Sequence, residues 1–182
     1  MKKVIIFFAN GTEEVEALTP LDYLRRAGAD VTLVGVSGKI QTGSHGITVE
    51  TDVAQSDLDP DADFDMLVFP GGMPGTDNIE KSPVAKALLT RAVAENKFIA
   101  AICAAPKILG SAGLLRGKTA TCYPGFEKYL DGAKISKDKA VLCGNIITAK
   151  GAGAANEFAF LLISALFGKE KADGVLRSVM FV

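Results

Sequence analysis

The sequence contains few of the residues from which metal and disulfide sites are usually built. It has three widely spaced cysteines, Cys103, Cys122 and Cys143, no Cys-x-x-Cys pair, and a single histidine, His45. A zinc site of the usual cysteine and histidine ligands is therefore not expected, and neither is a disulfide framework. Unpaired cysteines fit a reducing compartment, so we expect a cytoplasmic protein.

Long apolar runs and blocks of like charge are also missing. The apolar stretch at residues 4–9 is too short for a signal peptide, and the stretch at residues 158–167 is too short to cross a bilayer. The formal net charge is −1, and no basic stripe is present. We therefore expect neither a membrane partner nor specific recognition of nucleic acid.

The chain does have the length and apolar content of a folded core. With 182 residues, of which 48% are hydrophobic, it is predicted to form one domain over residues 1–182. Apolar runs without alternation predict strands buried on both faces, as in parallel sheets. These runs lie at residues 4–8, 66–69 and 98–102.

Helical patterns alternate with these strands. Apolar positions at helical spacing predict helices at residues 14–27, 84–95 and 154–166. Further strands are expected at residues 30–36, 118–122, 140–142 and 146–149, with a hairpin formed by residues 39–42 and 47–51 around the tip at 43–46. This alternation predicts an α/β fold in which helices sandwich a doubly wound, mostly parallel sheet.

Cys103 is the most informative single residue. It ends the apolar run at residues 98–102, and its neighbours Ala101, Ala104 and Ala105 are small. This pattern predicts a sharp, strained strand-to-helix turn that resembles a nucleophile elbow, with sulfur in place of oxygen. A helix beginning directly after the cysteine is expected to favour the thiolate through its dipole. The alternative is a buried structural cysteine.

An acidic residue and a glycine turn are expected close to this cysteine, because ligands bind beyond the carboxyl ends of parallel strands. Glu16 follows the first strand and has small, apolar neighbours, so we expect a protonated carboxyl that can transfer protons. Gly71 and Gly72 follow the strand at residues 66–69. The N–H groups of Gly72 and Ala104 are candidates for an oxyanion hole, although an ordinary turn would use the same glycines.

Other polar residues give weaker signals. Glu13 and Glu14 are interpreted as acids that complement the dipole of the first helix. His45 is interpreted as an exposed turn residue and is also a candidate, with Gly71 and Tyr123, for the lining of the cysteine's pocket. Tyr123 is expected to line this pocket with its phenol.

A partial dinucleotide fingerprint at residues 151–156 lacks its third glycine, and close packing of a helix on the sheet would require the same small residues. No cofactor is therefore expected. Cys122 and Cys143 are interpreted as core residues.

Three motifs together resemble a known family. They are NGTEEVE at residues 10–16, FPGG at 69–72 and AAICAAP at 100–106. In this order and spacing they resemble the ThiJ/PfpI superfamily, in the branch that contains the Parkinsonism-associated protein deglycase and bacterial YajL. The resemblance extends over essentially the whole chain.

The resemblance implies a flavodoxin-like homodimer with Cys103 as an oxidation-sensitive nucleophile and Glu16 as its protonated partner. Family members are described as cofactor-free glyoxalases, deglycases, oxidation-sensitive thiol proteins and chaperones. The expected substrates are methylglyoxal, glyoxal, or early glycation adducts on proteins or nucleotides. A non-catalytic redox sensor and a stress chaperone stay open as alternatives.

The chain departs from some relatives at three positions. Peptidase relatives carry histidine directly after the nucleophile, whereas this chain has Ala104, so a peptidase is not expected. Some relatives place a histidine near the cysteine where this chain has Tyr123. His45 occupies the position of an arginine near the dimer contact, which the family forms with the first helix and the hairpin tip at residues 43–46.

Overall fold

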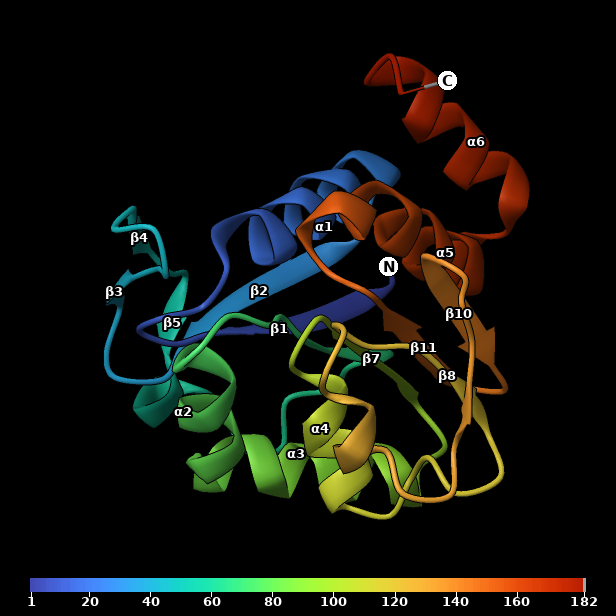
Figure 1. Ribbon diagram of the computed structural model, residues 1–182. Coiled ribbons are helices and arrows are strands. Elements are labelled where there is room, and N and C mark those ends of the chain that lie inside the picture. The colour runs from blue at the N-terminus through green and yellow to red at the C-terminus, as the bar shows by residue number, and fades with distance from the viewer. Residues whose placement is uncertain (182) are drawn as a thin grey trace.

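The computed structural model of the protein describes residues 1–181. Its strands are β1 (Lys3–Phe8), β2 (Asp30–Gly35), β3 (Ile40–Thr42), β4 (Thr48–Glu50), β5 (Val53–Ala54), β6 (Met66–Phe69), β7 (Phe98–Ile102), β8 (Thr119–Ala120), β9 (Lys134–Ile135), β10 (Ala140–Cys143) and β11 (Ile146–Ala149). Its α-helices are α1 (Glu14–Ala27), α2 (Gly75–Lys81), α3 (Pro83–Ala94), α4 (Pro106–Ser111), α5 (Ala155–Phe167) and α6 (Lys169–Ser178) (Figure 1).

The main sheet has seven strands in the order β10-β11-β7-β6-β1-β2-β5. All neighbouring strands are parallel except β10 and β11, which are antiparallel. The five inner strands β2-β1-β6-β7-β11 follow the flavodoxin-like order, in which the first strand lies between the second and the third. The predicted α/β fold with a mostly parallel sheet is therefore confirmed.

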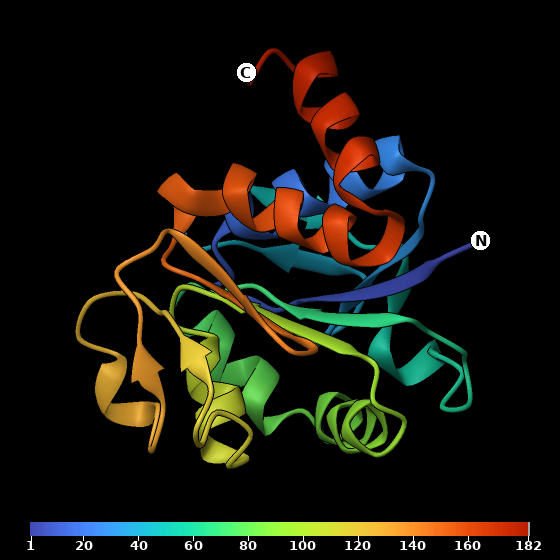
Figure 2. The same cartoon turned by 90° about the vertical axis from the view of Figure 1, so that its right-hand side faces the viewer.

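Helices cover both faces of this sheet, which Figure 2 shows edge-on. Helices α1 and α5 pack on one face, where Phe8 and Phe158 are fully buried. Helices α3 and α4 pack on the other, where Phe7 stacks on Phe69 with ring centroids 5.8 Å apart. Because successive residues of a strand point to opposite faces, β1 alone contributes to both cores.

Several short elements differ from the sequence prediction. The predicted hairpin forms, but β3 and β4 make a separate two-stranded sheet that is not part of the main one. The strand predicted at residues 118–122 is reduced to β8, which pairs only with β9. In the described residues, no helix is both long enough and apolar enough to span a membrane.

Candidate active site

Cys103 lies at a strained corner directly after β7. Its φ angle is +66°, in the left-handed region that residues other than glycine rarely adopt. Two backbone hydrogen bonds hold the corner: the Cys103 N–H donates to Ala149, at 2.9 Å, and the Tyr123 N–H donates to the Cys103 carbonyl, at 2.8 Å. The predicted sharp turn is therefore confirmed, and it leaves the thiol partly exposed.

Glu16 reaches this corner from α1. Its side chain is buried, with 1% of the residue exposed, and its Oε2 accepts a hydrogen bond from the Gly71 N–H at 2.9 Å. The carboxyl is also hydrogen-bonded to the Cys103 thiol and to the backbone N–H of Ala152. The structure thus brings together Glu16, Gly71 and Cys103, because they follow the adjacent strands β1, β6 and β7 (Figure 1).

The close approach of these groups requires glycine at position 71. A Cβ atom there would lie 2.5 Å from the Cβ of Cys103 and 2.6 Å from the Oε2 of Glu16, far inside van der Waals contact. The next residue, Gly72, has a φ angle of +84°. The glycine pair therefore shapes the site and is more than an ordinary turn.

Two backbone N–H groups lie beside the sulfur. Those of Gly72 and Ala104 both favour the thiolate of Cys103 and so lower the pKa of its thiol. They are the groups that the sequence suggested for an oxyanion hole. In this arrangement they can stabilise negative charge on the sulfur, or on an oxygen bound next to it.

The acid and the thiol form a coupled pair. Burial raises the pKa of Glu16 to about 7, and hydrogen bonds from Cys103 and Gly71 only partly oppose this. Burial, and then the charge of Glu16, raise the pKa of the Cys103 thiol to about 12. The pair therefore loses one proton near neutral pH and keeps the other far into the alkaline range.

These shifts correct one expectation from the sequence. A helix dipole was expected to lower the pKa of the thiol, but α4 begins only at Pro106 and has six residues. Burial outweighs the two N–H groups that favour the thiolate. An ionised Glu16 carboxylate beside the thiol is placed where it can accept the thiol proton, and such a transfer leaves the net charge of the pair unchanged.

Tyr123 and Gly151 border the same site. A Cβ atom on Gly151 would lie 3.3 Å from the Tyr123 ring, 3.7 Å from the Glu16 Oε1 and 3.9 Å from the Cys103 sulfur. These residues adjoin a surface groove of about 350 Å³ lined by Tyr123, Pro124, Lys139, Lys150 and residues 151–154. Residues of the partial dinucleotide fingerprint at 151–156 thus form one wall of this groove. The N–H of Ala152, in the same segment, favours the Glu16 carboxylate.

His45 belongs to a different group of side chains. Its Nδ1 lies 3.1 Å from the Oε2 of Glu14 and 3.3 Å from that of Glu13, and its side chain is 67% exposed. The sequence indicated the exposure of His45 but missed the role of Glu14, which is 3% exposed and binds the hairpin tip. An acid at the start of a helix is already accounted for by the helix dipole, so the sequence offered no reason to expect a side-chain partner for Glu14. Nothing in the local pattern therefore revealed its contact with the hairpin tip.

The remaining cysteines lie outside the site. Cys122 is buried, as predicted, and burial raises the pKa of its thiol to about 11. Cys143, at the end of the edge strand β10, is only partly buried. The prediction of a core residue is therefore wrong for Cys143, because an edge strand has a neighbour on one side only.

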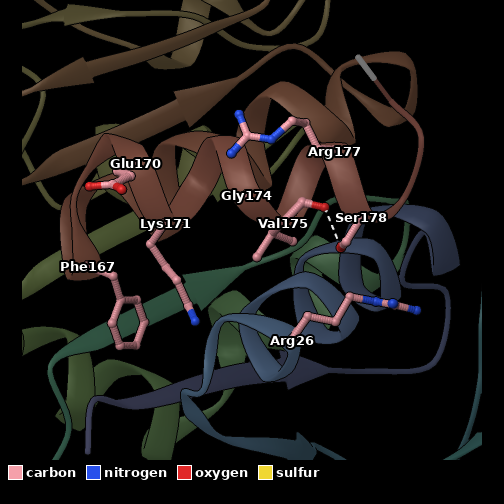
Figure 3. Close-up of a pocket in the computed structure, with 8 residues that line it drawn as sticks. All are labelled: Arg26, Phe167, Glu170, Lys171, Gly174, Val175, Arg177 and Ser178. Atoms are coloured by element: carbon pink, nitrogen blue, oxygen red, sulfur yellow. Dashed lines mark hydrogen bonds between the residues drawn. The ribbon is translucent and has the colours of Figure 1, made fainter.

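A larger hollow lies elsewhere on the molecule. It has a volume of about 520 Å³ and is lined by residues of α1 and α6 with their flanks, among them Arg26, Lys171 and Arg177 (Figure 3). None of the candidate catalytic residues lines it. The site is therefore marked by its chemistry and not by the size of its cavity.

Comparisons with known proteins identify relatives in both sequence and fold. A sequence model of the DJ-1/PfpI family matches residues 2–165. The chain is 40% identical over 174 residues to "Protein DJ-1 homolog B" of Arabidopsis thaliana, covering 94% of this chain but only 40% of that protein. This chain therefore spans less than half the length of that relative. It is also 35% identical to the "Parkinson disease protein 7 homolog" of Danio rerio, covering 96% of this chain and 94% of the other.

The fold is shared with solved structures of the same group. Oxidized DJ-1 of Toxoplasma gondii superposes with a TM-score of 0.94 at 35% identity, covering 99% of this chain and 98% of that one. Two more distant relatives carry names of activities. A protein of Pyrococcus abyssi named as a deglycase is 33% identical over 83% of this chain and 91% of its own length. A "glutathione-independent glyoxalase" of Caenorhabditis elegans is 32% identical over 96% of this chain and 93% of its own.

Proposed function

This chain belongs to the DJ-1/PfpI family, in the branch of the DJ-1 homologues, and on that premise we propose that it is a cysteine-dependent glyoxalase or deglycase. Its substrates are methylglyoxal, glyoxal or their early glycation adducts. The observation that carries the proposal is the pairing of Cys103 with the buried Glu16 carboxyl, under two N–H groups and beside an open groove. Relatives named as a deglycase and a glyoxalase support it.

The reaction begins with attack of sulfur on the aldehyde carbon of methylglyoxal. Glu16 accepts the thiol proton as the carbon–sulfur bond forms, and the aldehyde oxygen gains the negative charge. The N–H groups of Gly72 and Ala104 stabilise this oxyanion. Glu16 then gives the proton to this oxygen, which yields a hemithioacetal on Cys103 and restores the carboxylate.

The second stage moves hydrogen between the two substrate carbons. Glu16 removes the proton from the carbon bound to sulfur and returns it to the neighbouring carbonyl carbon. The hydroxyl proton of the hemithioacetal moves to the oxygen of that carbonyl, so the second carbon becomes a hydroxyl-bearing carbon. The first carbon is thereby oxidised to a thioester while the second is reduced. Hydrolysis of the thioester consumes one water, releases lactate and restores the thiol, so the reaction needs no external oxidant or reductant.

A peptidase mechanism has little support in this site. Ala104 follows the nucleophile, and the one histidine contacts Glu13 and Glu14. No imidazole is therefore available to Cys103 as a general base, and Glu16 is the group that can take its proton.

The experiment that tests this function offers two substrates to the purified protein without glutathione. Lactate is measured from free methylglyoxal, and release of the parent amino acid is measured from its methylglyoxal adduct with free aldehyde scavenged. Lactate alone would mean a glyoxalase, and release from the scavenged adduct would mean a deglycase. Neither product above the buffer rate would reject both activities.

Redox sensing is the second candidate function, favoured by the contrast between two thiols. Cys103 is partly exposed, next to a carboxyl and two N–H groups that can bind the oxygens of a sulfinate, whereas Cys122 is 4% exposed. Under mild peroxide, peptide mass spectrometry is expected to find oxidation at Cys103 first. Earlier oxidation of Cys122 or Cys143 would exclude this function.

A further inference from the structure

The groove beside Cys103 is lined by charge of one sign only. Among residues 1–181, its charged lining residues are two lysines, Lys139 and Lys150, and no acid lines it. The groove reaches the thiol at Gly151, where an added Cβ atom would lie 3.9 Å from the Cys103 sulfur. A substrate that reacts with this thiol and extends into the groove therefore meets a basic wall.

The two lysines differ in how their charges are balanced. The Nζ of Lys139 lies 2.5 Å from the Oε1 of Glu157, so a carboxylate compensates its charge. The Nζ of Lys150 donates a hydrogen bond to the backbone carbonyl of Lys137, and within the described part of the chain it forms no ion pair. A carbonyl orients an ammonium group without neutralising it. Because an ammonium has several N–H donors, Lys150 can also bind an anion.

The backbone fixes Lys150 close to the reacting sulfur. This residue directly follows β11, and its N–H donates to the carbonyl of Lys139 at 2.9 Å. Its neighbour Gly151 borders the sulfur, and consecutive Cα atoms lie about 3.8 Å apart. Lys150 is half-buried, which limits the screening of its charge by water and salt. A substrate with its carbonyl at Cys103 can therefore place an anionic group at Lys150.

The groove offers more space than methylglyoxal needs. Its volume of about 350 Å³ is in the range of sites that hold much larger ligands. Its walls include Tyr123, which is 51% exposed, and the small residues 151–154, so a flat apolar group can lie between the carbonyl and the anionic end of a substrate. The lining residues lie outside α1 and the hairpin β3–β4, the elements expected in the dimer contact.

We propose that Lys150 is a specificity-determining residue, which selects substrates that carry an anionic group on the side away from the reacting carbonyl. The substrate class is an α-oxoaldehyde, or its early adduct, that bears a carboxylate or a phosphate. This inference rests on the proposed function and narrows its substrates. The chemistry at Cys103 and Glu16 is unchanged, because Lys150 binds the distant anion and not the reacting atoms.

The first test compares two substrates that differ in one charged group. Phenylglyoxal is neutral and 4-carboxyphenylglyoxal carries a carboxylate, and the proposed reaction converts each to the corresponding mandelate. Lys150→Met removes the charge and keeps the length of the side chain. This variant is expected to lower the ratio of kcat/KM for the carboxylated over the neutral substrate about fivefold. Lys150→Arg, which keeps the charge, is expected to retain the wild-type ratio.

Lys137→Met is the matched control for the first test. Lys137 is an exposed lysine close to Lys150, but its side chain does not line the groove. This variant is expected to keep the wild-type ratio. An unchanged ratio in Lys150→Met would overturn the proposal, and so would an equal fall in Lys137→Met, since the effect would then come from general charge.

A second test measures binding without turnover. Benzoate and phenyl phosphate are titrated separately while the amide signals of Gly151 and Gly153 are followed by NMR. We expect both signals to shift in the wild type and the affinity to fall about fivefold in Lys150→Met. The tighter of the two ligands identifies carboxylate or phosphate as the preferred anion. No shift with either ligand would overturn the proposal, whereas absence of mandelate from neutral phenylglyoxal would reject the proposed function and not the binding site.

Discussion

At the scale of the residue, the chemistry depends on one proton held between two buried groups. Burial disfavours the ionised form of both Glu16 and Cys103. The charge of an ionised Glu16 raises the pKa of the thiol further, whereas the hydrogen bond from the thiol favours the Glu16 carboxylate. In the proposed reaction, the active form of the pair has lost one proton, so that the carboxylate can accept the proton of the thiol. This form is populated above the first ionisation of the pair.

The pH profile of the reaction follows from this coupling. Because burial raises the pKa of Glu16 to about 7, kcat/KM for methylglyoxal is expected to rise with pH through about 7 and then level off. The Glu16→Gln variant should retain less than about 1% of the activity, since general acid–base catalysis contributes about 10²–10⁴-fold. A profile already flat from pH 5 upward in the wild type would contradict this assignment.

The same buried acid destabilises the fold as pH rises from about 4.5 through about 7. The pKa of Glu16 rises from 4.5 to about 7 on folding, so the folded state binds the proton more tightly than the unfolded chain does. Stability is therefore lost as pH rises through this window, by about 3 kcal/mol when complete. Between pH 5 and pH 8, wild-type stability in urea should fall by this much more than that of Glu16→Gln. Parallel curves would argue against a buried titrating Glu16.

Gly151 and Gly153 offer a matched test of how the substrate reaches the sulfur. Alanine at position 151 would place a methyl group 3.9 Å from the sulfur, in space that the substrate needs, whereas alanine at position 153 contacts nothing within 4 Å. Gly151→Ala is expected to lower kcat/KM for methylglyoxal about tenfold or more, and Gly153→Ala to leave it within about twofold. Equal effects of the two substitutions would mean that the substrate approaches from another direction.

At the scale of the element, Glu14 fastens the tip of the hairpin β3–β4 to α1, beside hydrogen bonds that join the hairpin to residues 10–12 ahead of the helix. The hairpin does not pair with the main sheet. Burial opposes the ionisation of Glu14, but backbone hydrogen bonds and His45 outweigh it and lower its pKa to about 2. Its contribution to stability is therefore complete above the unfolded value of 4.5, and it is lost as pH falls toward 2.

Hydrogen exchange can measure this link. Glu14→Ala removes the acceptor of the His45 and Ile47 N–H groups. Their protection is expected to fall at least tenfold, because a buried hydrogen bond to a charged group contributes about 1.5–3 kcal/mol. The control Glu50→Ala, in the same hairpin, should leave both amides protected. Unchanged protection in Glu14→Ala would show that the hairpin is held by other contacts.

The sequence predicts long elements better than short ones. The strands β6 and β7 and the helix α1 have the predicted boundaries, because continuous apolar runs and helical spacing are strong local signals. Two-residue strands such as β5 and β9 have no such pattern, since their pairing depends on neighbours distant in the chain. The contact of Glu14 with His45 was missed for the same reason.

At the scale of the whole molecule, the order of the strands assembles the site. Glu16, Gly71 and Cys103 are far apart in the sequence, yet they follow β1, β6 and β7, which are neighbours in the sheet (Figure 1). The sequence predicted that these three residues lie close together, because the carboxyl ends of parallel strands lie at the same edge of a sheet. It could not predict the coupled ionisation, which depends on how deeply each group is buried.

The central claim is that Cys103 carries out the chemistry at this edge. The most direct measurement compares lactate formed from methylglyoxal, without glutathione, by the wild type and by Cys103→Ala and Cys143→Ala. Both cysteines are partly exposed, and only Cys103 lies beside Glu16. We expect lactate from the wild type and from Cys143→Ala, and none above the buffer rate from Cys103→Ala. Undiminished lactate formation by Cys103→Ala would contradict the account.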